Sequence, residues 1–289
     1  MRRRGKHAGR SGPGPLRSWW PRPLSRVVPR PPTSAATVLA LLAVALVVLS
    51  PAGTAADAGV ESLTESVPLT AASFAGTPAV GALLQGGPNG NHFCTASVVN
   101  SPGADLIVTA AHCVNSYTSN PGSITFAPGY HDGRAPYGTW TVTRIYTSQK
   151  WQSNTDQDDD VAFLTVQGPV QKYTGAERLA PAARTVSDLA SRGTVVRVIG
   201  YPDGQGLPVT CQNHVTMLSP TQMEFDCKAY TDGTSGGPFL TRINPVTGTG
   251  TMVGVVGGYQ QGGDTPDVSY SPTFGPDVQA LYRSAAGQG

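Results

Sequence analysis

The spacing of apolar and turn-forming residues predicts a chain built mostly from short β-strands. After a distinct N-terminal stretch, short apolar or alternating runs are separated by Gly, Pro, Asn and Asp, a pattern typical of all-β proteins. Thr139–Tyr146 alternates most clearly, with Trp140, Val142 and Tyr146 on one face. The expected strands are Ala79–Leu84, Phe93–Val99, Leu106–Ala110, Thr139–Tyr146, Val161–Val166, Thr194–Gly200, Gln222–Cys227, Gly237–Thr241 and Thr251–Gly257.

Helical periodicity is confined to the C-terminus. There Pro276 is suited to the first turn of a short helix that carries Val278, Leu281 and Tyr282 on one face. The composition agrees with an all-β fold, because 35 of the 289 residues are Gly and 25 are Pro. Some 210 residues after the N-terminal stretch are enough to bury two separate cores. Polar and small residues between 168 and 191 mark the expected join between two halves.

Residues 1–58 have the pattern of a signal peptide with a long basic n-region. Residues 1–34 hold nine Lys or Arg and no acid, residues 35–49 are almost wholly apolar, and Ala-x-Ala-like sites end at Ala56 and Ala58. A transmembrane anchor is the alternative, but this apolar stretch falls short of the roughly 20 residues that span a bilayer. We therefore expect a secreted protein with no stable membrane association after signal removal. Residues 59–74 are interpreted as a short propeptide or N-terminal extension.

The basic character of the chain belongs to this leader. The formal net charge of the whole chain is +2, and loss of nine basic residues together with Asp57 leaves −6. No other basic cluster favours a nucleic-acid partner, so none is expected. We also expect the mature protein to be a monomer.

A glycine-rich hexapeptide, Gly-Thr-Ser-Gly-Gly-Pro at 233–238, offers a nucleophile in a tight turn. Glycines on both sides of Ser235 allow the N–H groups of Gly233 and Ser235 to point at one spot, where an oxyanion can sit. The alternative interpretation of this hexapeptide is a Gly-rich surface turn without a catalytic role. The same letters also match the nucleophile elbow of α/β-hydrolases, in which the histidine follows the serine. No histidine follows Ser235, so the base has to lie upstream.

His112 is the best candidate for that base. It follows the apolar run Leu106–Ala111, and its neighbour Cys113 can tether it in a fixed orientation, as a general base requires. A packed core histidine is the competing interpretation. Asp160 supplies a carboxylate at the entrance to the buried run 161–164, where it can orient the imidazole. The aspartates at 156, 158 and 159 are expected on the surface of an acidic loop.

Three motifs in the order His, Asp, Ser give the chain a specific resemblance. Thr-Ala-Ala-His-Cys at 109–113, Asp-Val-Ala-Phe-Leu at 160–164 and Gly-Thr-Ser-Gly-Gly-Pro at 233–238 resemble the chymotrypsin-fold, trypsin-like serine peptidases, above all the secreted bacterial ones. The resemblance implies an all-β fold of two six-stranded antiparallel β-barrels with a short C-terminal helix. The first barrel is placed at 75–180 and the second at 181–289, with the catalytic cleft between them.

The resemblance also implies the roles of individual residues. His112 is the general base, Asp160 its orienting partner and Ser235 the nucleophile, with the amides of Gly233 and Ser235 as the oxyanion hole. The family position that often sets the charge of the primary pocket falls on Ala229, which is not an acid. Gly257 and Gly258 are further candidate pocket residues. The stretch Gly262–Tyr270 resembles the far wall of the pocket, where Asp264 or Asp267 can place a carboxylate; a surface turn is the alternative for both.

Two positions depart from the family pattern. Thr234 stands where many animal members have an Asp that pairs with a newly cut N-terminus, so activation by that ion pair is not expected. Gly257 aligns with a serine that usually binds the triad Asp, so Asp160 has to be supported by other groups.

Four cysteines in an exported chain indicate two disulfides. The resemblance implies a Cys94–Cys113 bridge beside the catalytic histidine, with Cys211–Cys227 as the second. Zinc is the competing interpretation, but no C-x-x-C or H-E-x-x-H spacing occurs, and neither a metal nor another cofactor is expected. We therefore expect a secreted serine endopeptidase that acts on proteins or peptides. A catalytically silent binding protein on the same fold and an esterase with the same triad are the alternatives.

Overall fold

The computed structural model describes residues 69–182 and 184–287. The predicted signal peptide and most of the segment 59–74 therefore lie outside the described residues. The end of that segment belongs to the folded unit: strand β1 (Ala72–Ser73) pairs with strand β10 (Val209–His214), and the Ala71 amide donates to the Lys228 carbonyl. No helix in the described part of the chain is both long and apolar enough to cross a membrane.

The first half is a closed, six-stranded antiparallel barrel. Its strands follow one another around the barrel in the order β2-β3-β4-β7-β6-β5. They are β2 (Val80–Gln85), β3 (His92–Val98), β4 (Leu106–Thr109), β5 (Ile124–Pro128), β6 (Trp140–Thr147) and β7 (Ala162–Val166). In β2 an added Cβ at Gly81 would lie 2.2 Å from the Ala127 carbonyl oxygen, so the β2–β5 contact requires a residue without a side chain.

The barrel strands form where apolar and β-branched residues run without interruption. All four residues of β4, from Leu106 to Thr109, are buried, and so are all five of β5. Strand β6 buries Val142, but its predicted alternation is only partly correct. A register shift between Val142 and Arg144 turns the strand, so that Ile145 packs with Trp140 and Val142 while Tyr146 packs in a different core cluster. Strands buried on both sides read as continuous apolar runs, which is why β4 and β7 were predicted with nearly the observed ends.

The second half consists of two sheets. A six-stranded sheet has the order β1-β10-β9-β13-β14-β8, and a three-stranded sheet has the order β11-β12-β15. The remaining strands are β8 (Arg178–Leu179), β9 (Val195–Gly200), β11 (Thr216–Met217), β12 (Gln222–Asp226), β13 (Pro238–Thr241), β14 (Thr251–Val255) and β15 (Val268–Pro272). Strand β8 runs parallel to β14.

This half lacks the continuous ladder of the first barrel. Strands β10 and β12 are joined by the Cys211–Cys227 disulfide and by a hydrogen bond from the Asn213 side-chain amide to the Asp226 carbonyl. Phe225 of β12 and Phe239 of β13 meet edge to face in a shared core. In the second half, side chains and a covalent bridge therefore join β10 to β12, which belong to different sheets. In the first half, backbone hydrogen bonds between neighbouring strands close the barrel.

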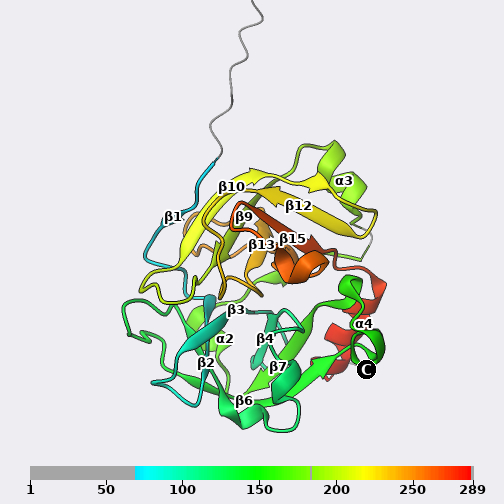
Figure 1. Ribbon diagram of the computed structural model, residues 1–289. Coiled ribbons are helices and arrows are strands. Elements are labelled where there is room, and N and C mark those ends of the chain that lie inside the picture. The colour runs from blue at the N-terminus through cyan, green and yellow to red at the C-terminus, as the bar shows by residue number, and fades with distance from the viewer. Residues whose placement is uncertain (1–68, 183, 288–289) are drawn as a thin grey trace, which may run out of the picture. The chain divides into compact units, whose positions relative to one another are not determined.

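The predicted C-terminal helix is confirmed as α4 (Pro276–Ala285). It packs against the first barrel, where Tyr282 contacts Phe163 with ring centroids 5.7 Å apart. Figure 1 shows α4, in red, beside strand β7 of that barrel. Three short helices were not expected: α1 (Gln149–Asn154), α2 (Gln171–Thr174) and α3 (Val186–Ser191).

Candidate active site

His112 stands directly beyond the end of β4. Ala110 and Ala111 are fully buried, so the backbone that leads to the histidine is fixed by the barrel core. The Cys94–Cys113 disulfide ties the next residue to β3. Only about a tenth of the His112 side chain is exposed, at 12%. The chain therefore presents one edge of the imidazole ring at the surface.

Asp160 lies between the 3-10 turn η3 (Gln157–Asp159) and the start of β7, and it is fully buried. Its Oδ2 lies 2.8 Å from His112 Nδ1, and its Oδ1 accepts a hydrogen bond from the His112 amide at 2.9 Å. The Gly258 amide donates to Oδ2 at 2.8 Å. An added Cβ at Gly257 would lie 3.0 Å from the same oxygen. The Gly258 amide thus supports the carboxylate at the position where a family serine is missing.

Asp159 corrects one expectation from the sequence. It is only 4% exposed rather than on the surface, and its carboxylate lies 3.9 Å from Lys150 Nζ. Burial raises the pKa of the Asp159 carboxyl, and the Coulombic effect of Lys150 opposes that rise. Asp158 is exposed, as expected, and Asp156 is half-buried. The η3 turn brings Asp159 inward because its backbone folds back before β7 begins.

Ser235 lies in a loop between Tyr230 and β13. Gly233 and Gly236 have φ angles of 89° and 81°, which side chains other than glycine rarely adopt. At Gly236 an added Cβ would lie 2.1 Å from Thr109 Oγ1 and 2.2 Å from the Thr95 carbonyl oxygen. Glycine at 236 therefore lets the serine loop approach the strands that lead to His112. Within the described residues, the amides of Gly233 and Ser235 donate to no protein acceptor.

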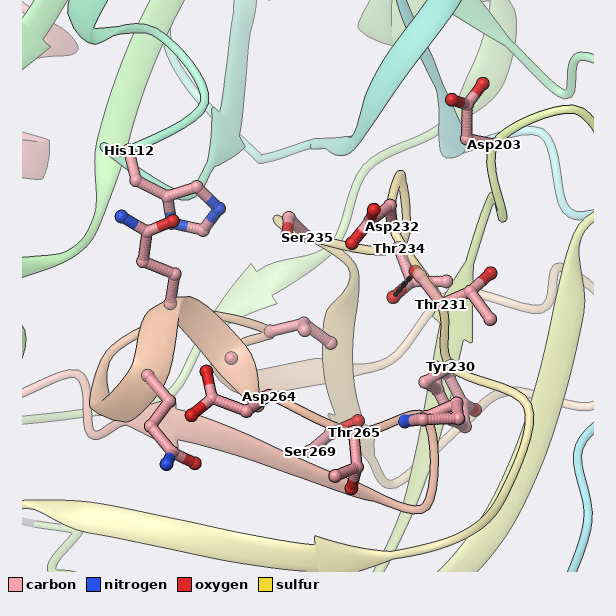
Figure 2. A pocket seen from close by; sticks show the side chains of 16 residues that line it. His112, Asp203, Tyr230, Thr231, Asp232, Thr234, Ser235, Asp264, Thr265 and Ser269 are labelled. Atoms are coloured by element: carbon pink, nitrogen blue, oxygen red, sulfur yellow. Dashed lines mark hydrogen bonds between the residues drawn. The ribbon is translucent and has the colours of Figure 1, made fainter.

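His112 and Ser235 line one cleft of about 680 Å³. Figure 2 shows the His112 ring facing the Ser235 side chain, with Thr231 and Asp232 on one side of the space and Asp264, Thr265 and Ser269 on the other. The lining of the cleft is polar and contains no Lys or Arg. It includes three carboxylates, those of Asp203, Asp232 and Asp264.

Of the pocket residues that the sequence suggested, only some line the cleft. Asp264 lines the cleft, whereas Asp267 lies outside its lining and is 3.8 Å from Lys228 Nζ. Ala229 is next to the lining residue Tyr230 and has a φ angle of 77°. Gly257 and Gly258 lie beside Asp160 rather than in the cleft lining, where their neighbour Val256 stands.

Several cleft residues were not found from the sequence. Asp203, Asp232 and the turn η4 (Tyr259–Gly262) all come from loops, whose positions depend on the strands around them. The Gly258 amide also escaped notice, because a backbone donor has no mark in the sequence. Asp232 could have been found, since it directly precedes the Gly233–Ser235 motif.

Cys94, Cys113 and His112 place possible metal-ligand atoms within 4.8 Å of one another. Both sulfurs belong to a disulfide, so they cannot act as the thiolates that bind Zn²⁺. His112 Nδ1 faces Asp160, so Nε2 is the one remaining donor of this group, and a single donor is too few for a zinc site. This donor set therefore does not fit a metal ion.

Comparisons with known proteins agree with this geometry. Residues 94–249, more than half of the chain, match the family described as the trypsin-like peptidase domain. A curated relative, the "Extracellular metalloprotease" of Bacillus subtilis strain 168, is 31% identical over 110 residues, which are 38% of this chain. The matched part spans a third of that relative's length, 33%.

Three solved structures share the fold. The protease Anisep from Arthrobacter nicotinovorans is 24% identical with a TM-score of 0.59, over 74% of this chain and 98% of that one. The thermostable serine protease AL20 from an extremophilic microorganism is 25% identical with a TM-score of 0.59, over 74% and 99%. A Glu endopeptidase is 19% identical with a TM-score of 0.59, over 76% and 98%. These likenesses identify the fold as chymotrypsin-like.

Proposed function

We propose that this chain, which belongs to the trypsin-like peptidase family, is a secreted serine endopeptidase that forms an acyl-enzyme on Ser235. The observation that carries the proposal is the buried Asp160 carboxylate 2.8 Å from His112 Nδ1, with the other edge of that imidazole in one cleft with Ser235. The predicted signal peptide and the two disulfides support secretion.

The chemistry follows from the orientation of the imidazole. An Nδ1–H that donates to Asp160 leaves Nε2 free to take the proton from the Ser235 hydroxyl as its oxygen attacks the scissile carbonyl carbon. Asp160 stabilises the imidazolium that results. The negative charge on the carbonyl oxygen is stabilised by the free amides of Gly233 and Ser235. His112 then gives its proton to the leaving amine, and water releases the acyl group by the same steps in reverse.

The charge of the cleft favours cationic substrates. Asp203, Asp232 and Asp264 contribute three carboxylates to the lining, which contains no Lys or Arg. Carboxylates in a cleft attract Lys and Arg side chains and repel Asp and Glu. We therefore propose peptides with Lys or Arg near the scissile bond as substrates, and we expect acidic peptides to be poor ones.

A fluorophosphonate probe and a mixed peptide library test the proposal together. We expect the probe to label Ser235 in the secreted protein, and the library to yield cuts inside peptides, enriched for basic residues. Labelling at another serine, or library peptides left intact, would contradict an endopeptidase that acts through Ser235. Intact peptides together with hydrolysed esters would instead identify an esterase. No labelling and no turnover would identify a binding protein.

A further inference from the structure

We propose that Thr95 is a positioning residue for the reaction: its hydroxyl group holds the loop that carries the Gly233 and Ser235 amides. This inference rests on the proposed peptidase function. Thr95 belongs to β3 of the first barrel and is fully buried, whereas the loop belongs to the second half. The residue does not touch the substrate and acts through the backbone of the loop.

Thr95 makes four hydrogen bonds, and three of them lead to the Ser235 loop or to the segment before His112. Its hydroxyl donates to the Gly233 carbonyl at 2.9 Å and accepts from the Tyr201 amide at 2.9 Å. Its own amide donates to the Ser235 carbonyl at 2.8 Å. Its carbonyl accepts from the Thr109 hydroxyl at 2.7 Å, three residues before His112. One buried residue therefore contacts both the nucleophile loop and the segment that carries the base.

The loop is held by its carbonyl groups. The carbonyls of residues 231, 232 and 234 accept from the amides of residues 234, 203 and 237. Thr95 holds the other two, the carbonyls of Gly233 and Ser235. Because a peptide group is planar, fixing its C=O also fixes the direction of its N–H. This arrangement leaves the amides of Gly233 and Ser235 free for an oxyanion.

The Thr95 hydroxyl fixes the peptide group between Gly233 and Thr234, whose carbonyl it binds. The Gly233 N–H belongs to the preceding peptide group, and the Ser235 N–H belongs to the following one. Gly233 has a φ angle of 89°, and a flexible residue at this point requires an external hold. Rotation of the central plane would change the angle between the two donors, although neither donor touches Thr95.

Only a hydroxyl group meets both demands at this place. It has to accept from the Tyr201 amide and donate to the Gly233 carbonyl, which serine and threonine can do and valine cannot. The adjacent Cys94 is tied to Cys113, next to His112. A shift of Thr95 would therefore move the base and the oxyanion donors together.

Thr95→Val keeps the shape of the side chain and removes the hydroxyl group. We expect kcat, measured per active site titrated with a fluorophosphonate, to fall on the order of 10-fold to 100-fold, because small misplacements of reacting groups have effects of that size. KM should stay within about 2-fold, because the substrate contacts are unchanged. Thr95→Ser should restore most of kcat. A peptide aldehyde, whose adduct places an oxyanion in the hole, should bind Thr95→Val more weakly by a similar factor.

Ser97→Ala is the matched control. Ser97 lies two residues further along β3, is fully buried, and has a hydroxyl without a hydrogen-bond partner. We expect its kcat to equal that of the unaltered protein. If Thr95→Val loses only stability and its titrated sites keep full kcat, Thr95 is structural and the proposal is wrong. Equal losses in kcat for Ser97→Ala, or no rescue by Thr95→Ser, would also overturn it.

Thr95→Cys replaces the valine variant if that variant does not fold. A thiol is a weak donor and acceptor, so kcat should fall several-fold, and an unchanged kcat would contradict the proposal. Failure of the underlying function is a separate result: Ser235→Ala would then retain activity, or the unaltered protein would show none, whatever Thr95 does.

Discussion

The two halves hold the groups of the proposed catalytic site in different ways. In the first half, His112 and Asp160 follow or precede strands of a closed barrel and contact each other directly. In the second half, Ser235 lies in a glycine-rich loop whose carbonyls are bound partly by the first barrel. The first half therefore supplies both members of its pair, with one added hydrogen bond from the Gly258 amide of the second half, whereas the Ser235 loop depends on docking against the first barrel. Substitutions inside the first barrel should therefore mainly disturb the His112–Asp160 pair, whereas substitutions at the contacts between the halves should mainly disturb the Ser235 loop.

The largest effect is expected from the groups that react. Ser235→Ala and His112→Ala should each lower kcat on the order of 10⁶-fold, with the double variant little worse, because the groups act as a unit. Measured turnover of the three variants, normalised to folded protein, checks this. Additive losses in the double variant would show that the two halves act independently.

Asp160→Asn tests the support inside the first half. The fold should persist, and kcat should fall on the order of 10⁴-fold, because an amide favours the wrong imidazole tautomer. Asp158→Asn is the control, since Asp158 is exposed and, among the residues that the structure describes, its carboxylate accepts only from the Gln222 side chain. Steady-state kinetics of both variants decide the matter. An Asp158 variant as inactive as the Asp160 variant would exclude this assignment of roles.

The two disulfides allow a direct comparison of the halves. Each closes a loop of similar length, with sequence separations of 19 and 16, and should contribute about 3 kcal/mol to the free energy of unfolding. Replacing either pair with alanine should lower Tm by a similar amount. At temperatures below the melting transitions of both variants, loss of Cys94–Cys113 should reduce kcat more than loss of Cys211–Cys227, because the first disulfide holds His112. Calorimetry and kinetics of both variants check this, and equal kcat values would contradict it.

Glu177 should give the smallest and most pH-dependent effect. Burial raises the pKa of this carboxyl to about 7, while the Gly250 amide and Arg197 oppose the rise. The native state then binds more protons than the unfolded state between pH 4.5 and about 7. The free energy of unfolding should therefore fall as pH rises through this window, by at most about 3 kcal/mol.

Glu177→Gln should remove that slope and be more stable than the unaltered protein at pH 8. Denaturant unfolding at several pH values measures it. Glu224→Gln, a change on the half-exposed side of β12, serves as the control and should leave the slope in place. A slope that survives in Glu177→Gln would assign the pH dependence to other groups.

The sequence predicted most of the first barrel and the contact between His112 and Asp160, because buried strands read as unbroken apolar runs. It missed the two-residue strands β1, β8 and β11. It also missed β5, β10 and β15, which are bounded or interrupted by polar residues and proline. It also missed α3, although the capping box formed by Thr185 and Asp188 marks its start. The cleft was the least predictable part, because its carboxylates lie on loops and the support of Asp160 comes from a backbone amide.

The ends of the described chain cross over between the halves. Strand β1 completes the sheet of the second half, while α4 covers the first barrel and Tyr282 donates to the Asn100 carbonyl there. A segment that comes late in the sequence thus covers the half that comes first. A chain cut short before Pro276 would leave Phe163 without its aromatic partner. Folding of the first barrel should consequently be finished only when α4 docks on it, so the order in which the chain folds differs from the order of its sequence.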